Sequence, residues 1–514
     1  MARDLILAHD LGTTGDKATL FDVEGRLIAS AFHGYDTAYP EIGWAEQSPE
    51  DWWEAFRLAT RRLLRESRVD PGRIAAISFS GQMMGCLPVD RSGRPLRNAI
   101  IWADQRSLEE AALLAERVGE TRVYEITGHR ISPTYSMEKL LWLRAHEPEV
   151  FRTTYKVLHA KDFLRLRLTD TYATDYSDAS SMNLFDLRSK AWSSEILDAV
   201  GLPVEVLPEV GPSTKVVGTI DGRTGDDLGL RAGTPVVMGG GDGPCAAVGA
   251  GVVAEGSAYN YIGSSSWIAL ATSRPIYDPD RRTFNFFHLE PDTIMPTGTM
   301  QTAGAAYQWA RDVLCADLVA EAARSGASPY QLMDREAALR PAGCRGLLFL
   351  PYLMGERSPH WNPHARGVFV GLTPSHVRGD MLRAVLEGVG FNLRIILDAF
   401  TRQRVRIPAM RLIGGGAKGA LWRQILADVL GIAVQPLELL EEATSLGAAI
   451  AGGVGVGALP DFTDAERIVR VAETVEPRPD VRDVYEAQYE VFRDAYAALA
   501  PIYPRLGGSG AGGR

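Results

Sequence analysis

The chain has 514 residues, of which 46% are hydrophobic and 23% are charged, and its net charge is -10. This is the composition of a globular protein long enough for two or more domains. The acidic balance argues against a nucleic-acid partner, because nucleic-acid binders carry a basic domain or stripe. The four cysteines are widely spaced, which argues against a structural zinc site or a disulfide framework. The sequence shows no signal peptide and no apolar run long enough for a bilayer, so we expect a cytoplasmic protein without a membrane partner.

The N-terminal segment predicts an antiparallel meander followed by a helix and a buried strand. Three apolar runs separated by turn-forming residues predict the strands of the meander, at 5–9, 18–21 and 27–32. Ser48, with Pro49 and two acids after it, predicts the start of a helix that runs to about Arg65. The run at 74–79 then predicts a buried strand. This order differs from an alternating βαβ pattern, so a plain doubly wound sheet is not expected.

The middle of the chain predicts three helical segments, at 107–118, at 137–146 and from Asp162 onward. A polar loop is expected at 171–183. After this loop, the stretch 236–251 combines a β-branched run, three glycines, Asp242 and Pro244. Because proline favours the first position of a helix, the stretch predicts a strand-to-helix corner that carries a carboxylate. Two interpretations stay open for Asp242: it caps the helix, or it faces a cleft.

The second half of the chain repeats the pattern of the N-terminus. The stretch 258–271 has the same order of strand, glycine, two hydroxyl residues and strand. In this alignment Tyr261 falls where Asp10 stands, and the turns align as Gly12, Thr13 and Thr14 over Gly263, Ser264 and Ser265. The repeat predicts two related domains that each offer a hydroxyl-lined turn to one cleft.

We expect these domains at 1–253 and 254–500, followed by a flexible tail at 501–514. In the second domain, residues 410–419 predict another strand that leads into a glycine loop, and a helix with one apolar face follows. A C-terminal helix is expected at 481–499.

These pieces fit phosphoryl transfer, which needs donors around the phosphates, a divalent metal and a carboxylate that accepts a proton from the attacking hydroxyl. Asp10 is the candidate ligand of Mg²⁺ through water. Asp242 is the candidate general base and a second candidate metal ligand. The candidate phosphate donors come from both turns: Gly12, Thr13, Thr14 and Lys17, and Gly263, Ser264 and Ser265. The candidates for contact with the sugar or phosphate of the nucleotide lie where a helix opens, and they are Gly414, Gly415 and Gly416.

The loop from Gly414 to Gly419 also supports a competing class of protein. Its GxGxxG spacing after a strand and before a helix, with Glu438 beyond the next strand, is typical of dinucleotide-binding oxidoreductases. Against that class, the loop lies far along the chain and outside a run of alternating βαβ units. A non-enzymatic actin-like ATPase is a third alternative.

Several motifs resemble those of the FGGY carbohydrate kinases. They are Asp-Leu-Gly-Thr-Thr at 10–14, Gly-Trp-Ala-Glu-Gln-Ser-Pro-Glu-Asp-Trp-Trp at 43–53, Gly-Gln-Met-Met-Gly at 81–85, Ile-Ile-Trp-Ala-Asp-Gln-Arg at 100–106, Gly-Gly-Gly-Asp at 239–242, Gly-Glu-Arg-Ser-Pro-His at 355–360, and the segment 367–387. The resemblance implies an α/β protein with an actin-like ATPase fold, in which two ribonuclease-H-like domains enclose ATP and a sugar. It also implies ATP and Mg²⁺ as cofactors, Asp242 as the base, and a loop from Gly414 through Ala417 and Lys418 that faces the adenosine.

The same resemblance places the sugar against five residues: Gln82, Met83, Trp102, Asp104 and Asp242. The sequence leaves alternatives open, namely that Trp102 is an ordinary core residue and that Asp104 forms a local surface ion pair with Arg106. Two positions depart from the xylulokinase-like pattern, because Met84 replaces a histidine and Gly243 replaces an amide residue. Both changes remove hydrogen-bonding groups. We therefore expect a kinase of a small sugar or polyol, with a pentulose first and a pentitol, tetritol or other ketose next. A homodimer is one assembly that we consider.

Overall fold

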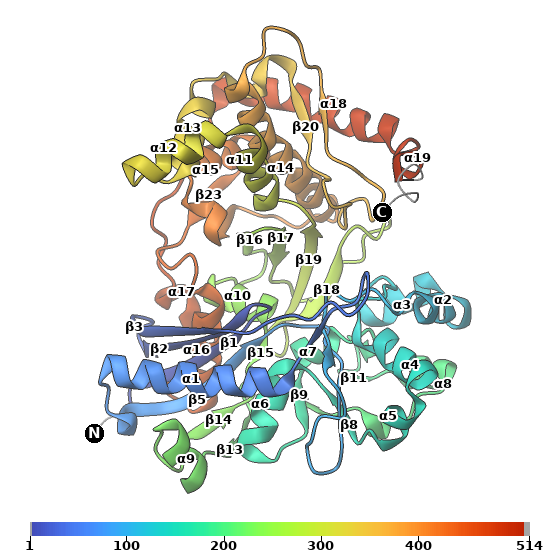
Figure 1. The fold of residues 1–514 in the computed structure, drawn as a ribbon, viewed down its shortest axis with the longest axis vertical. Helices are drawn as coiled ribbons and strands as arrows, with labels where there is room; N and C mark the ends of the chain where they lie inside the picture. The colour runs from blue at the N-terminus through green and yellow to red at the C-terminus, as the bar shows by residue number, and fades with distance from the viewer. Residues whose placement is uncertain (1–2, 508–514) are drawn as a thin grey trace.

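The computed structural model describes residues 3–507 and contains two large mixed sheets, one in each half of the chain (Figure 1). The first sheet runs in the order β13 (Val216–Thr219), β14 (Pro235–Val237), β5 (Ile74–Gly81), β1 (Leu5–Leu11), β2 (Gly15–Asp22) and β3 (Leu27–Gly34), with β15 (Gly240–Gly241) beside β5. The second runs in the order β18 (Phe284–Phe287), β19 (Ile294–Met300), β17 (Ser266–Leu270), β16 (Ala258–Ile262), β22 (Ala409–Ile413) and β23 (Ala433–Pro436).

The two sheets share one topology. In each, an antiparallel meander is joined through its first strand to parallel strands that come later in the chain. β1 pairs in parallel with β5 as β16 pairs in parallel with β22, and β14 and β23 extend these pairs. This is the duplication that the aligned turns of the sequence predict.

Short two-stranded sheets lie outside the two large ones, and they consist of β4 (Glu46–Gln47) with β7 (Ala99–Ile100), β6 (Leu87–Val89) with β8 (Lys156–Leu158), β9 (Ala173–Asp175) with β12 (Glu209–Gly211), β10 (Phe185–Asp186) with β11 (Ala191–Trp192), and β20 (Leu348–Leu350) with β21 (Val368–Val370).

The helices of the first half are α1 (Pro49–Ser67), α2 (Leu108–Arg117), α3 (Glu120–Thr127), α4 (Ser136–His146), α5 (Pro148–Thr153), α6 (Ala160–Thr169), α7 (Tyr176–Ser180), α8 (Ser194–Val200), α9 (Gly222–Leu228) and α10 (Asp242–Gly249). Those of the second half are α11 (Gly304–Leu314), α12 (Ala316–Ser325), α13 (Pro329–Ala338), α14 (Arg378–Thr401), α15 (Ala420–Leu430), α16 (Ala443–Gly455), α17 (Asp464–Ile468), α18 (Arg482–Leu499) and α19 (Tyr503–Gly507). Among residues 3–507, no helix combines the length and the apolar character that crossing a bilayer requires.

The start of α1 follows the signals in its sequence. The Oγ of Ser48 accepts a hydrogen bond from the amide of Asp51 at 3.3 Å, and Pro49 occupies the first turn, where its missing N–H costs nothing. Trp52 and Phe56 then lie on one buried face of the helix, against the first sheet. Here the predicted N-cap is confirmed.

Three local predictions are wrong. Residues 171–183 are not a plain loop, because they contain β9 and α7. α10 begins at Asp242 with Gly241 as its N-cap, so Pro244 is the third residue of the helix and not the first. α6 begins at Ala160, before Asp162, whose carboxylate accepts a hydrogen bond from the amide of the N-cap residue. Short buried segments without a clear period carry little signal in the sequence.

The expected tail at 501–514 is structured at its start. Tyr503 lies in α19 and is buried, with 1% of its surface exposed. Residues 508–514 lie outside the described residues.

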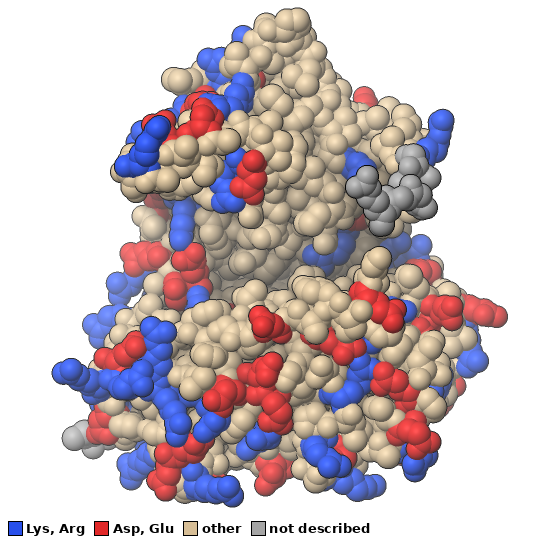
Figure 2. Space-filling view, viewed as in Figure 1, with Lys and Arg blue, Asp and Glu red and all other residues tan. Residues whose placement is uncertain are grey.

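The structure has two lobes, and both α10 and α16 lie in the lower one (Figure 1). α10 and α16 pass so closely that a Cβ on Gly249 would lie 1.7 Å from the carbonyl oxygen of Ala443. α16 belongs to the second half of the sequence, but it shares a buried cluster with residues of β1 and β5. In the space-filling view, a hollow with mostly uncharged visible walls separates the lobes, and charged side chains of both signs cover the lower lobe (Figure 2).

Candidate active site

Neighbouring strand ends bring the two candidate acids together. In the first sheet, Asp10 of β1 lies opposite Ser80 of β5, which in turn lies opposite Gly240 of β15. The Oγ of Ser80 donates a hydrogen bond to Asp10 at 2.9 Å. Asp242 follows Gly240 by two residues, in the first turn of α10. Both carboxylates therefore lie at the carboxyl edge of the parallel strands, where α/β proteins bind their ligands.

The glycines before Asp242 are required by close packing. Gly239 has a φ of +70°, and a Cβ there would lie 2.0 Å from the carbonyl oxygen of Phe79. A Cβ on Gly240 would lie 2.9 Å from the Oγ of Ser177. Neither position can carry a side chain without moving its neighbours, so the turn that carries Asp242 is held tightly on both sides.

Burial raises the pKa of both carboxylates, and the charge of Asp10 adds to the shift at Asp242. Burial, together with the charge of Asp10, raises the pKa of Asp242 to about 7, while the amide of Gly243 opposes the shift by donating to its Oδ1 at 2.8 Å. Burial also raises the pKa of Asp10, against the hydrogen bond from Ser80 and the charge of Lys17. A carboxylate with a pKa near neutrality can accept a proton from a hydroxyl and return it at physiological pH.

The first hydroxyl turn is tied to the candidate sugar pocket. The carbonyl oxygen of Gly12 accepts hydrogen bonds from the Tyr35 hydroxyl and, at 3.4 Å, from the Nε2 of Gln82. The indole Nε1 of Trp102 donates to the Oγ1 of Thr13 at 2.9 Å. Trp102 is half-buried and is thus not an ordinary core residue. Thr14 is exposed at the tip of the turn.

Gln82 and Met83 lie beside the turn that carries the base. Gln82 is buried, and its Nε2 donates to Gln47 at 2.7 Å, but its Oε1 has no partner among the described residues. A buried oxygen without a partner is costly, so this atom is suited to accept from a hydroxyl of a ligand. The Sδ of Met83 would lie 2.6 Å from a Cβ on Gly241, so the thioether packs directly on the glycine turn.

The second hydroxyl turn, between β16 and β17, consists of Gly263, Ser264 and Ser265. Its carbonyl oxygens cap the start of α11, since Gly263 accepts from the amide of Gly304 at 2.9 Å and Ser264 from that of Ala303 at 2.8 Å. From the same hairpin, the Tyr259 hydroxyl donates to the carbonyl oxygen of Gly243 at 2.8 Å. The second sheet is therefore bonded directly to the residue that follows Asp242.

The third glycine loop adjoins the second turn. β22 ends beside β16, where Ile413 lies opposite Tyr261, and the amide of Gly414 donates to Leu440 at 2.8 Å. The residues Gly415–Lys418, which include Gly416 and Ala417, form a 3-10 turn, and α15 begins only at Ala420. These glycines therefore open a short 3-10 helix that precedes α15, and a nucleotide here would meet the start of that short helix.

Lys17 and Lys418 meet one acidic segment across the two halves. The Nζ of Lys17 donates to the carbonyl oxygen of Glu441 at 3.0 Å and lies 3.9 Å from the carboxylate of Glu442. The Nζ of Lys418 lies 2.8 Å from the carboxylate of Glu441. The ammonium group of Lys17 bonds to this segment in the structure, and its expected phosphate contact stays a prediction.

Asp104 is not available to a sugar in this structure. It is fully buried, and its carboxylate accepts from the amide of Ala45 at 2.6 Å and from the guanidinium of Arg106 at 2.8 Å. Arg106 also lies over the ring of Trp44, with 3.7 Å between its Cζ and the centroid. The sugar contact predicted for Asp104 is therefore corrected to a buried ion pair that holds the loop after Trp102.

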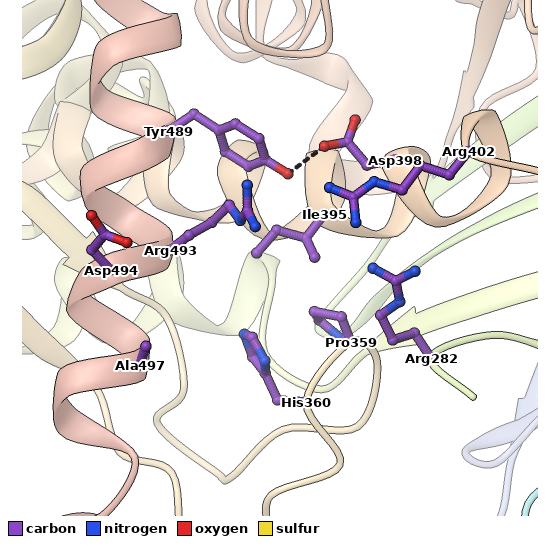
Figure 3. Close-up of a pocket in the computed structure, with 10 residues that line it drawn as sticks. All are labelled: Arg282, Pro359, His360, Ile395, Asp398, Arg402, Tyr489, Arg493, Asp494 and Ala497. Carbon is purple, nitrogen blue, oxygen red and sulfur yellow. Dashed lines mark hydrogen bonds between the residues drawn. The ribbon is translucent and has the colours of Figure 1, made fainter. Parts of the chain in front are cut away.

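Some residues of the site gave no usable signal in the sequence. Ser80, Tyr35 and Tyr259 each bond to a site residue, but they come from separate strands or loops, and only the fold brings them together. A cavity of about 270 Å³ between α14 and α18 is lined by none of the predicted site residues, and there Tyr489 donates to Asp398 at 2.7 Å (Figure 3). It is separate from the site around Asp242.

Comparison with known proteins places the whole chain in one family. The profile of the N-terminal domain of the FGGY family of carbohydrate kinases matches residues 5–249, and that of the C-terminal domain matches residues 258–456. A xylulose kinase of Staphylococcus epidermidis is 32% identical over 497 residues, which cover 96% of this chain and 97% of the relative. A gluconokinase of Bacillus licheniformis is 30% identical over 502 residues, which cover 98% of this chain and 97% of the relative.

The solved structures agree with the sequence relatives. The crystal structure of a ligand-bound xylulose kinase from Lactobacillus acidophilus superposes with a TM-score of 0.91 at 29% identity, and the match covers 98% of this chain and 99% of the other. With the two family profiles, this match confirms the predicted fold class, an actin-like ATPase fold of two ribonuclease-H-like domains.

Proposed function

The chain belongs to the FGGY family of carbohydrate kinases, and from this premise we propose that it transfers the γ-phosphoryl group of ATP to a hydroxyl of a pentulose, with Asp242 as the general base. The observation that carries the proposal is the position of Asp242. It lies at the edge where three strands end, near Asp10, and burial together with the charge of Asp10 raises its pKa to about 7.

Asp242 would take the proton of the sugar hydroxyl as that oxygen attacks phosphorus. The proton leaves the hydroxyl for the Asp242 carboxylate, the new P–O bond forms on the sugar oxygen, and the bond to the β-phosphate oxygen breaks. The turn at Gly12–Thr14 would supply amide and hydroxyl donors on one side of the phosphates, and the turn at Gly263–Ser265 would supply them on the other. A closer approach of the lobes would exclude water as a competing acceptor.

The acids around the cleft fit a magnesium ion. Ser80 occupies one oxygen of Asp10 and the amide of Gly243 occupies one oxygen of Asp242, which leaves each carboxylate with oxygen ligands of the kind that Mg²⁺ prefers. Asp10 would hold the ion through water, and Asp242 is a second candidate ligand. The ion, when bound with ATP, neutralises charge on the phosphates.

The sugar would lie between Trp102 and the turn that carries the base. The free Oε1 of Gln82 would accept from one of its hydroxyls, and the ring of Trp102 would lie against an apolar face. Met83, Met84 and Gly243 offer no strong hydrogen-bonding side chain, so hydroxyl recognition depends on few groups. The relative named as a gluconokinase makes an aldonate the second candidate substrate.

An ATP-coupled assay over pentuloses, hexuloses, pentitols, tetritols, glycerol and D-gluconate tests the proposal. The expected result is the highest kcat/KM with a pentulose, and release of ADP that requires the sugar. A preference for gluconate, or hydrolysis of ATP at the same rate without any sugar, would overturn the pentulose assignment. ATP with Mg²⁺, and not NAD, should raise the melting temperature. A homodimer, a cytoplasmic location and the lack of a nucleic-acid partner stay predictions from the sequence.

A further inference from the structure

α7 is one short turn of helix whose serines bind the backbone of three other segments. The Oγ of Ser177 accepts from the amide of Gly241 at 2.9 Å, in the turn that carries Asp242. The Oγ of Ser180 accepts from the amide of Phe287 at 3.0 Å, in β18 of the other lobe. Just after the helix, the Oγ of Ser181 accepts from the amide of Met84 at 3.3 Å. α7 is thus a common support for the base turn, the other lobe and the sugar pocket.

The bond from Gly241 is the first link of a buried polar chain. The Ser177 hydroxyl that accepts from Gly241 donates in turn to the Oδ2 of Asp175, the N-cap residue of α7. The Oδ1 of Asp175 lies 2.9 Å from the Nζ of Lys161, at the start of α6. All three side chains are at most 1% exposed. Because each link is buried, breaking one leaves a polar group without a partner and without water.

Lys161 pairs with two further carboxylates below the turn. Its Nζ also lies 2.7 Å from Asp162 and 2.9 Å from Asp178. The carboxylates of Asp162 and Asp178 lie near His159 at a spacing that a metal ion could use, but the ammonium group of Lys161 already occupies the space between them. Buried charges of one sign are stable only with a partner, so the lysine keeps α7 and the start of α6 in one arrangement.

Steric contacts leave little room between α7 and the base turn. A Cβ on Gly240 would lie 2.9 Å from the Oγ of Ser177. On the opposite side of Gly240 and Gly241 runs β5, where a Cβ on Gly81 would lie 3.0 Å from the Cβ of Lys161. The peptide between Gly240 and Gly241 is therefore enclosed by β5 and α7, and its N–H is directed at one acceptor.

We propose that Ser177, held by the buried Lys161–Asp175 pair, is a positioning residue that fixes the Gly240–Gly241 peptide and with it the place of Asp242 at the start of α10. This inference rests on the proposed role of Asp242 as the base. Loss of the Ser177 hydroxyl frees the Gly241 amide, and the carboxylate of Asp242, the next residue in the chain, no longer has a fixed position relative to the sugar hydroxyl. Small errors in the position of a catalytic group lower the rate of the chemical step more than they weaken binding.

The test compares Ser177→Ala with Ser180→Ala. Both serines are fully buried on the same helix, and each accepts from one backbone amide, but only Ser177 bonds to the base turn. Hydrogen–deuterium exchange is measured on peptides that cover 238–243 and 284–288, and kcat and KM are measured with ATP, Mg²⁺ and D-xylulose. Ser177→Cys, which keeps a weak acceptor at the same place, is a second variant should the alanine variant not fold.

Ser177→Ala should speed exchange at the Gly241 amide about tenfold or more and leave the Phe287 amide protected. Its kcat should fall about tenfold or more, with the KM for ATP within about twofold of wild type. Ser180→Ala should show the reverse pattern of exchange, and Ser177→Cys should lie between wild type and Ser177→Ala in kcat. Unchanged protection of the Gly241 amide in Ser177→Ala, or equal losses of kcat in both alanine variants, would overturn the proposal. If wild type has no activity with any sugar, the proposed function fails, while the exchange data still decide whether Ser177 holds the turn.

Discussion

Asp242→Asn should make the protein more stable at pH 8 while it removes the proposed base. Burial and the charge of Asp10 raise the pKa of Asp242 from 3.8 to about 7. The folded protein therefore holds a proton in the range where the unfolded chain has lost it. The contribution of this group to the free energy of unfolding is full below pH 3.8 and is lost as the pH rises through about 7.

The size of the effect follows from the shift in pKa. About three pKa units, at 1.36 kcal/mol per unit, make the ionised carboxylate cost about 4 kcal/mol above pH 7. Asparagine has the same shape and keeps an oxygen that can accept from the amide of Gly243, but it carries no charge. The free energy of unfolding of Asp242→Asn should therefore exceed that of wild type by up to about 4 kcal/mol at pH 8. This difference should shrink by about 1.4 kcal/mol for each pH unit below 7.

Urea unfolding of wild type and variant at pH 5, 6, 7 and 8 measures this gain. Asp10→Asn supplies the control, because it removes the like charge that contributes to the shift. The gain in free energy of unfolding should be smaller in the double variant than the sum of the gains in the two single variants, because the repulsion between the two carboxylates can be relieved only once. Equal effects of Asp242→Asn at pH 5 and pH 8, or a loss of stability at pH 8, would refute the reasoning.

The same carboxylate should control the pH dependence of the rate, so kcat/KM should fall about tenfold per pH unit below about 7, and a flat profile down to about pH 5 would argue against Asp242. Gly243→Asn should fold normally, because a Cβ there would lie 3.5 Å from the Cε of Met295, and it should change the ratio of kcat/KM between two ketoses by about tenfold. An unchanged ratio would show that residue 243 does not face the sugar. Trp102→Phe keeps an aromatic ring but loses the 2.9 Å bond to Thr13, so kcat should fall about threefold to tenfold. If Trp102→Phe lowers kcat by the same factor when Thr13 is already replaced by valine, the hydrogen bond between Trp102 and Thr13 is not the cause of the loss.

The sequence predicts much of the fold because its local signals agree with the final packing. The N-cap at Ser48, the meander strands and the repeated glycine–hydroxyl turns all appear where they were expected, since turn chemistry and apolar runs act locally. The segment that contains α7 is the counterexample. Its serines and acids are polar and would normally be solvated, but they are buried, and Lys161 of the preceding helix α6 supplies a positive charge to the acids.

In the candidate site, too, local sequence signals predict some residues, while tertiary contacts decide others. Asp242 and Asp10 could be found from their glycine-rich surroundings, because close approach of the backbone demands glycine. The ion pair of Asp104 with Arg106, and the attachment of Lys17 to Glu441, depend on tertiary contacts that no local pattern records. Long polar side chains bond to whatever the fold brings near them, so their partners are the least predictable part of a site.

The most direct test of the central claim is the turnover of Asp242→Asn with ATP, Mg²⁺ and the sugar that wild type phosphorylates best. The predicted result is a kcat lowered by about a thousandfold, with the ATP-dependent rise in melting temperature retained. Turnover close to that of wild type would contradict the assignment of Asp242 as the base.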